Sequence, residues 1–223
     1  MGAAVAVRNR YLRTDEPDAP DCPNVSWISS PVRGSFPANS KGDRMHRALK
    51  VVAPLAIAAL PLLAPAAASA DSGWSFQASL KPLNHSTATG TVMIHGSGNQ
   101  ATITEHVSGL AATFGKSPYP HVQHIHINAQ GVCPSMAADK NGDGVVSTTE
   151  GAPFYGPIGT TLSVSGGTTP ADGTNIKIAP SGGSYTYSRT ITLDSATMSS
   201  LKAGKAVVVV HGLDPATLSK QAQ

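Results

Sequence analysis

The sequence is short of the residues that would place it in several common classes of protein. It has only two cysteines, Cys22 and Cys133, which excludes a small domain held together by several disulfides. After residue 70, eight Lys and Arg residues are balanced by eight Asp and Glu residues, so the formal net charge of +3 belongs to residues 1–70. Residues 71–223 therefore lack the excess of basic residues that is typical of nucleic-acid binding, and we expect no nucleic-acid partner.

The longest apolar run is too short to cross a membrane comfortably. It covers residues 51–64, follows a short basic segment that begins at Met45, and leads to Ala68-Ser-Ala70. This order is typical of a secretory signal peptide. We predict a signal peptide over 45–70 with cleavage after Ala70, export to the medium or the cell envelope, and no stable membrane span afterwards. The alternative is a single membrane anchor, which the two prolines in the run disfavour.

Residues 1–44 precede this signal peptide and have a composition rich in Arg, Pro, Asp and Ser, without an apolar period. Such a composition is typical of an unstructured segment. Because a signal peptide normally begins at the start of translation, we expect Met45 to be the true start. Residues 1–44 are then either disordered or an extension that is not part of the translated protein. Residues 71–223 suffice for one domain with a proper core.

Long helical periods are absent from this domain, whereas Gly, Ser and Thr are abundant. A short helix is predicted over 194–204, with Asp194 as its N-cap and Gly204 at its end. Many short strands separated by turn residues predict an all-β barrel or sandwich. The segments that read as strands are 74–80, 91–95, 101–107, 159–164, 175–179, 185–193 and 206–211.

Three histidines, His121, His124 and His126, lie within six residues of one predicted strand. Alternation along the strand places His124 and His126 on one face, and Ile125 and Ile127 on the other. Two imidazoles side by side form half of a transition-metal site. The alternative is that these histidines fill space or face water. Other histidines that we consider as a further ligand are His85, His95 and His106.

Residues 139–150 match the twelve-residue calcium loop at each diagnostic position. Gly144 stands where the loop must turn sharply, Val145 would bind through its carbonyl oxygen, and Glu150 can supply two oxygens. The predicted calcium ligands are Asp139, Asn141, Asp143, Val145, Ser147 and Glu150. The alternative is that a loop rich in Asp, Asn and Gly is only a solvated turn, and Ser147-x-x-Glu150 also matches a helix capping box.

Gly151 and Pro153 come directly after this loop, and Pro134 precedes it. Both residue types disfavour the interior of a helix, so we expect no long helix on either side. The sequence therefore favours an isolated structural calcium site over a calcium sensor that opens on binding.

The order of these motifs resembles the copper/zinc superoxide dismutase family, over about residues 74–133 and 204–214. The residues that carry the resemblance are Gly90-Thr-Val, Val107-Ser-Gly-Leu110, His121-x-x-His124-x-His126, Gly131-Val-Cys133 and Ala206-Val-Val-Val-Val-His211. The resemblance implies a Greek-key β-barrel in which His124, His126 and His211 are copper ligands. It also implies that His121 and Cys133 are structural residues. A weaker resemblance is to the chordin-type repeat domain (CHRD) of secreted proteins, which has no established catalytic site.

Several parts of the family's pattern are missing. No histidine lies between residues 127 and 210, so the metal-bridging and zinc histidines have no counterpart, and the calcium motif takes the place of the zinc loop. The twelve residues after His211 contain no active-site arginine, no second cysteine and no closing strand. We therefore expect a barrel without its last strand, from a chain truncated relative to its core. Arg189 is the only arginine after residue 70, and we assign it no role in the site.

Three functions remain open. The first is a secreted metal-binding β-barrel, with calcium at 139–150, copper at the three-histidine site, metal ions as its partners and no protein partner that the sequence identifies. The second is a copper-dependent superoxide dismutase, which the missing bridging histidine and arginine disfavour. The third is a non-catalytic structural or cell-surface domain that is stabilised by calcium alone.

Overall fold

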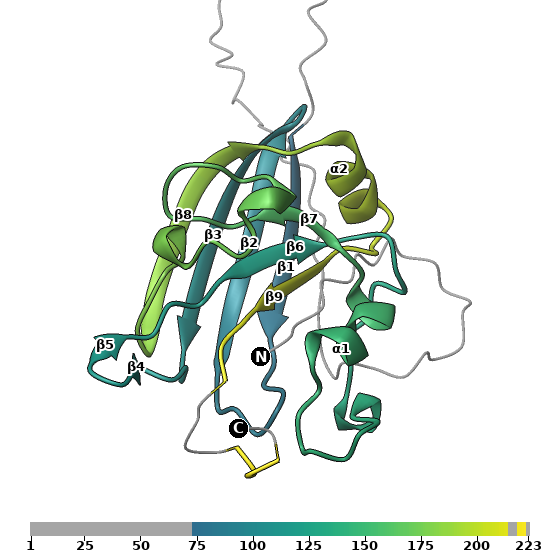
Figure 1. Ribbon diagram of the computed structural model, residues 1–223. Coiled ribbons are helices and arrows are strands. Elements are labelled where there is room, and N and C mark those ends of the chain that lie inside the picture. Colours follow the sequence, from purple (N-terminus) through teal and green to yellow (C-terminus); the bar gives the residue numbers. More distant parts are fainter. Residues whose placement is uncertain (1–72, 214–217, 222–223) are drawn as a thin grey trace, which may run out of the picture. The chain divides into compact units, whose positions relative to one another are not determined.

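The computed structural model describes residues 73–213 and 218–221 (Figure 1). The predicted extension over 1–44 and the predicted signal peptide over 45–70 lie outside these residues. The described part is built mainly from antiparallel strands with two short α-helices, which confirms the all-β prediction at this level. Within the described ranges, no helix is both long and apolar enough to cross a membrane.

The larger sheet has four antiparallel strands in the order β1-β2-β3-β8. Apolar and polar residues alternate along each strand, so one face is buried and the other meets solvent. The exposed positions of this sheet carry Ser, Thr, Gln, His and one Met, with no Asp, Glu, Lys or Arg. The strands are β1 (Trp74–Leu80), β2 (Thr89–Ser97), β3 (Gln100–Ser108) and β8 (Ser184–Thr192), which confirms four of the predicted strands.

The smaller sheet has three antiparallel strands in the order β7-β6-β9, with the histidine strand in the middle. These strands are β6 (Gln123–His126), β7 (Ile158–Thr161) and β9 (Val207–Val210). A small hairpin lies in the loop before β6, and each of its two strands, β4 (Thr113–Phe114) and β5 (Ser117–Pro118), has two residues. The described strands form separate open sheets and no closed barrel.

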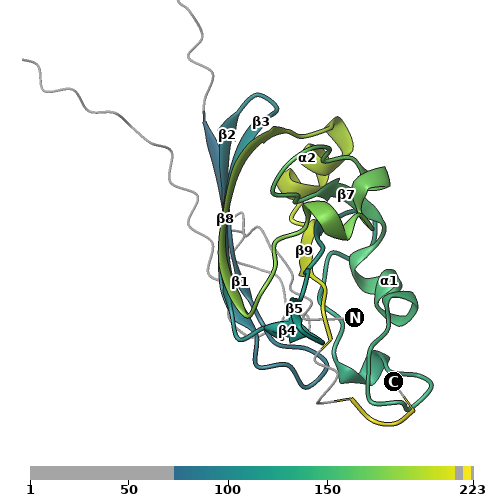
Figure 2. The same cartoon turned by 60° about the vertical axis from the view of Figure 1, so that its left-hand side comes forward.

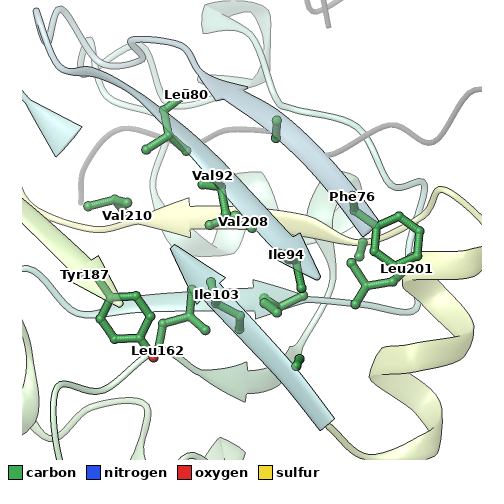
Figure 3. Close-up of a cluster of buried hydrophobic side chains, with 14 of the residues drawn as sticks. Phe76, Leu80, Val92, Ile94, Ile103, Leu162, Tyr187, Leu201, Val208 and Val210 are labelled. Atoms are coloured by element: carbon green, nitrogen blue, oxygen red, sulfur yellow. The ribbon is translucent and has the colours of Figure 1, made fainter. Parts of the chain in front are cut away.

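The main core lies between the four-stranded sheet and the three-stranded sheet, which form two layers (Figure 2). Inward side chains of both layers point toward one another there (Figure 3). Helix α2 (Ser195–Lys202) adds Leu201, which is fully buried, to this core. The side chain of Asp194 accepts a hydrogen bond from Thr197 N at 2.6 Å, so the predicted N-cap is confirmed. Each large apolar side chain buried here stabilises the fold by about 1.5–3 kcal/mol.

The smaller sheet is buried on its other face as well. Val207 and Val209 of β9 point away from the main core and pack with Leu83, Val146 and Tyr155 in a second cluster. Tyr155 is the last residue of helix α1 (Thr148–Tyr155), which covers this face. Burial on both faces explains why β9 is a continuous run of valine instead of an alternating pattern.

Two local predictions are wrong. Residues 176–178 form a turn of 3₁₀ helix, η3 (Ile176–Ile178), and not a strand, because the Asn175 side chain accepts from Lys177 N and caps the turn. Helix α1 also continues through Gly151 and Pro153, which we expected to stop it. A complete capping box between Ser147 and Glu150 starts this helix, and Gly156 ends it two turns later. The remaining 3₁₀ turns are η1 (Met136–Ala138) and η2 (Pro170–Asp172).

A fully buried carboxyl group, Glu105, lies in the main core. It pairs across β3 and β8 with Tyr187, and neither carboxyl oxygen has a hydrogen-bond partner among the described residues. The side-chain oxygen of Gln123 accepts a hydrogen bond from the hydroxyl of Tyr185 at 2.7 Å. Gln123 also lies near Glu105, but the two side chains do not reach hydrogen-bond geometry. Burial raises the pKa of Glu105 to about 8, although Gln123 partly offsets this shift. The group is therefore a neutral carboxylic acid in the folded protein at neutral pH.

We predict that Glu105 makes the protein less stable as the pH rises from about 4.5 to about 8. The folded state keeps the proton up to about pH 8, whereas the unfolded chain releases it near the ordinary pKa of 4.5. This contribution to stability is therefore complete below pH 4.5 and is lost toward pH 8, at about 1.4 kcal/mol per pH unit. Glutamine stays neutral, so Glu105→Gln should remove this dependence of the unfolding free energy on pH. Urea denaturation at a series of pH values measures it. Equal slopes for the variant and the wild type would contradict the prediction.

Candidate metal centre

The structure brings three of the predicted ligands together. His124 and His126 lie on the face of β6 that is turned away from the main core, opposite Val209 and Val207 of β9. His211 follows β9 directly and by alternation lies on the same face as Val209. The ring centroids of His124 and His211 are 5.0 Å apart, and those of His124 and His126 are 5.4 Å apart. One nitrogen of each ring lies within 4.8 Å of the other two, so the group can hold a metal ion.

Backbone carbonyl groups fix which nitrogen of two rings carries a proton. Nε2 of His124 lies 2.8 Å from the oxygen of Gly173, and Nδ1 of His126 lies 2.7 Å from the oxygen of Gly156. A carbonyl oxygen only accepts, so both of these nitrogens must donate. The other nitrogen of each neutral ring, Nδ1 of His124 and Nε2 of His126, therefore has a free lone pair. This is the usual arrangement of histidines that bind metals.

The remaining nitrogens are buried and have no hydrogen-bond partner among the described residues. They are Nδ1 of His124, Nε2 of His126 and Nε2 of His211. Leaving a buried polar atom without a partner costs about 1–3 kcal/mol, so three such atoms in one place call for an explanation. A metal ion would satisfy all three.

Burial keeps these imidazoles neutral. It lowers the pKa of His126 to about 4, although the Gly156 carbonyl favours the charged form and His124 disfavours it. Burial also lowers the pKa of His124, and it lowers that of His211 well below its usual value, with a further contribution from the two neighbouring histidines. Neutral imidazole is the form that binds a metal, so the site does not need to release protons at neutral pH.

His121 lies outside the three-histidine group and has a different environment. It is fully buried, and its two ring nitrogens lie 3.1 Å from the oxygen of His211 and 3.0 Å from the oxygen of Ala111. The ring therefore ties the chain that carries His211 to the loop before β4. A Cβ atom on Gly212 would lie 2.2 Å from Nδ1 of His121, so only glycine fits beside this ring.

Helix α1 holds His126 from the outside. The ring of Tyr155 packs edge-on against the ring of His126, with centroids 4.6 Å apart. Gly156, the next residue, supplies the carbonyl that accepts from His126. Its backbone has φ 86° and ψ −170°, a conformation that is available almost only to glycine.

The predicted calcium loop is folded back on itself by hydrogen bonds from its own side chains, but its carboxylate oxygens do not lie as close together as the nitrogens of the three histidines. Asp139 accepts from Gly142 N and Gly144 N, each at 2.8 Å, and Asn141 accepts from Asp143 N. The described part of the chain has no second group of three His, Cys, Asp or Glu side chains with donor atoms within 4.8 Å of one another. Calcium binding therefore stays a prediction from the sequence.

Glu150, the last predicted calcium ligand, has a carboxylate that accepts several backbone hydrogen bonds. One oxygen accepts from Lys140 N at 2.8 Å, and the other accepts from Ser147 N at 2.9 Å. Hydrogen bonds from the backbone of Ser147 and then of Lys140 lower the pKa of Glu150 to about 2. The group is therefore ionised at neutral pH, as a calcium ligand must be. Val145 and Ser147 lie in the same loop, the former buried.

The other residues considered in the sequence lie elsewhere. His85, His95 and His106 are exposed and do not belong to the three-histidine group. Cys133 is partly buried against the second apolar cluster. Arg189 donates to Ser163 O at 2.9 Å and to Gly166 O at 2.6 Å, so it holds the loop after β7 and does not point to the metal centre.

Three functional residues, Tyr155, Gly156 and Gly173, could not be found from the sequence. Gly156 and Gly173 act through backbone carbonyl oxygens, which every residue type has, so the sequence carries no signal for them. Tyr155 belongs to the segment that we expected to be irregular. Only a helix over 148–155 brings its ring to His126.

Comparisons with known proteins identify no relative: no family model, no curated protein and no solved structure matches this chain.

We predict that Gly156→Ala destabilises the fold and disturbs the metal centre. The positive φ alone should cost about 1–3 kcal/mol. A Cβ atom would also lie 1.9 Å from the oxygen of Ile127, so the backbone must move, and the carbonyl that orients His126 must move with it. Gly182→Ala is the matched control, because Gly182 has a φ of 91° but no atom within 4 Å of its Cβ position. Equal losses of unfolding free energy in urea would contradict this account.

Proposed function

We propose that the protein is an exported metal-binding β-sheet domain that holds one copper ion at His124, His126 and His211. The observation that supports this most directly is the set of three buried ring nitrogens without a hydrogen-bond partner, one from each of three histidines whose ligand atoms lie within 4.8 Å of one another. Imidazole nitrogens suit copper and zinc, whereas magnesium and calcium prefer oxygen. The carbonyl groups behind His124 and His126 preorganise both rings, so binding requires little ordering.

A bound copper ion would supply one-electron redox chemistry. The residues of this chain would bind and orient the ion. The second apolar cluster, which includes Tyr155 and Val209, excludes water from the side of β9. Nε2 of His211 is buried like the free nitrogens of the other two histidines, although other parts of this residue reach the surface.

We also propose a structural calcium ion in the loop 139–150. The complete ligand pattern of the sequence supports it, together with the ionised state of Glu150. The loop enters through one turn of 3₁₀ helix and leaves through the two turns of α1, so it lacks the long flanking helices of a calcium sensor.

On the resemblance to copper/zinc superoxide dismutases, we further propose that the protein is a distant member of that family that lacks the bridging and zinc histidines. Two packed antiparallel sheets, with the copper histidines on the central strand of one of them and at the end of a neighbouring strand, are compatible with that relation. The signal peptide predicted over 45–70 supports export.

Superoxide dismutation is the second candidate function. It is favoured by the group of three histidines, because a metal site with three protein ligands can take a further ligand. It is disfavoured by Arg189, since this arginine is committed to the loop at 163–166 and is not available to attract an anion to the metal. A domain that binds calcium alone is the third candidate, but it leaves the three buried nitrogens unexplained.

We predict that protein purified after export binds one copper ion, and that His124→Ala, His126→Ala and His211→Ala each abolish stoichiometric binding. The measurements are metal analysis by mass spectrometry and the nitrogen couplings in the electron paramagnetic resonance spectrum. His106→Ala is the control, because His106 is exposed on the larger sheet, where its Nδ1 forms a hydrogen bond with the hydroxyl of Thr186. Copper binding that survives loss of a ligand histidine would refute the site. A superoxide assay on the copper-loaded protein then separates an enzyme from a binding protein.

We further predict that calcium raises the melting temperature of the protein. A ligand at about one hundred times its dissociation constant stabilises the folded state by about 2.7 kcal/mol. Glu150→Gln, which removes the bidentate carboxylate, should abolish most of this gain in a thermal melt. If calcium has no effect on the melting temperature of the wild type, the loop is only a solvated turn.

A further inference from the structure

The two proposed metal sites are joined by one short helix. Helix α1 begins at the capping box of Ser147 and Glu150, which is also the end of the predicted calcium loop. It ends at Tyr155 and Gly156, the two residues that hold His126. Eight residues of α-helix span about 12 Å. The helix is thus short enough to move as one body.

At its far end the helix supports His126 in two independent ways. The carbonyl oxygen of Gly156 lies 2.7 Å from Nδ1 and fixes the proton on that nitrogen. The ring of Tyr155 packs on the imidazole and fixes its rotation. Displacement of this end of the helix would remove both supports together, and His126 would then have to be ordered by the metal itself.

At its near end the helix is tied to the loop through Glu150. The carboxylate reaches back to Lys140 N and Asn141 N at the start of the loop, and to Ser147 N at its end. Between these points, Val146 N donates to the side chain of Asn84 at 2.7 Å, so the loop is anchored to the connection between β1 and β2. Movement of the Glu150 carboxylate would therefore move the first turn of the helix.

Contacts within the helix link its first residue to its last residue, so the two ends move together. The hydroxyl of Tyr155 donates to the oxygen of Thr148 at 3.2 Å, from the last residue to the first. Gly151 lies beneath this ring, and a Cβ atom there would come within 2.4 Å of it. The ring is thus held between Gly151 and His126.

We propose that calcium in the loop 139–150 and copper at the three histidines bind cooperatively, with helix α1 as the connection and Tyr155 as a positioning residue for His126. Calcium would fix Glu150 and the first turn of α1, and the last turn would then present Gly156 and Tyr155 to His126 in the binding arrangement. This inference rests on the proposed function, and it adds regulation of the copper site by calcium. Coupling between sites in one protein typically changes affinity 5- to 150-fold, and it is reciprocal.

The test measures the affinity for Cu²⁺ in competition with a chelator, with saturating Ca²⁺, with Mg²⁺ at the same ionic strength, and with neither. We expect Ca²⁺ to tighten copper binding about 5-fold or more and Mg²⁺ to have less effect, because Mg²⁺ takes six ligands, keeps several waters and does not need both oxygens of Glu150. Copper should tighten calcium binding by the same factor in the reverse titration.

Two pairs of variants locate the coupling. Tyr155→Phe keeps the ring against Gly151 and His126 but loses the hydrogen bond to Thr148 O, so it should keep only part of the effect of Ca²⁺ on copper affinity. Tyr155→Ala removes the ring as well and should lose the effect while still binding calcium. Glu150→Gln should lose the response to Ca²⁺. Asp194→Asn is its matched control, because it removes the same charge from the cap of α2, where asparagine still caps the helix.

The outcomes separate this inference from the function on which it rests. If both metals bind and neither changes the affinity for the other, the coupling is refuted and the proposed function stands. If copper or calcium does not bind at all, the proposed site for that ion is refuted, and the coupling with it. If Tyr155→Ala retains the full response, the coupling does not pass through α1 as proposed.

Discussion

The burial of the smaller sheet on both faces is the constraint on which the metal centre depends. One face of β6 and β9 packs on the larger sheet, and the other is covered by α1 and the segment before it. Histidines on the covered face are removed from water, so their nitrogens must find partners within the protein. Two of them find backbone carbonyl groups, and the nitrogens that remain face one another. A sheet covered on only one side would have left the same histidines hydrated.

The covering segment is also the part of the chain with the least regular sequence. It lies between β6 and η3, and apart from strand β7 this stretch contains the calcium motif, the helical elements η1, α1 and η2, and many glycines. It nevertheless supplies both carbonyl groups, from Gly156 and Gly173. The three histidines and their supports thus come from different kinds of structure: the histidines from strands or a strand end, and the supports from the ends of helical turns.

The elements that could be predicted from the sequence are those with a strict period or a specific cap. The alternating strands β1, β2, β3 and β8 follow from a sheet with one wet face, and Asp194 marks the start of α2. His124, His126 and His211 could be chosen because imidazoles on one strand face are an unusual pattern. The turn at 176–178 and helix α1 were missed, because local capping by Asn175 and Ser147 outweighed the residue preferences of these segments. The capping-box match at Ser147-x-x-Glu150 was the sequence signal for the start of α1. The carbonyl supports have no sequence pattern at all.

The outer face of the larger sheet has a consequence for how small ions reach this protein. Four strands present hydroxyl and amide groups there with no Asp, Glu, Lys or Arg, while Arg189 and Glu105 point inward. Such a face adds no carboxylate, ammonium or guanidinium charge to the field around the protein. It therefore offers small anions and cations none of these charged groups to attract or steer them from that side.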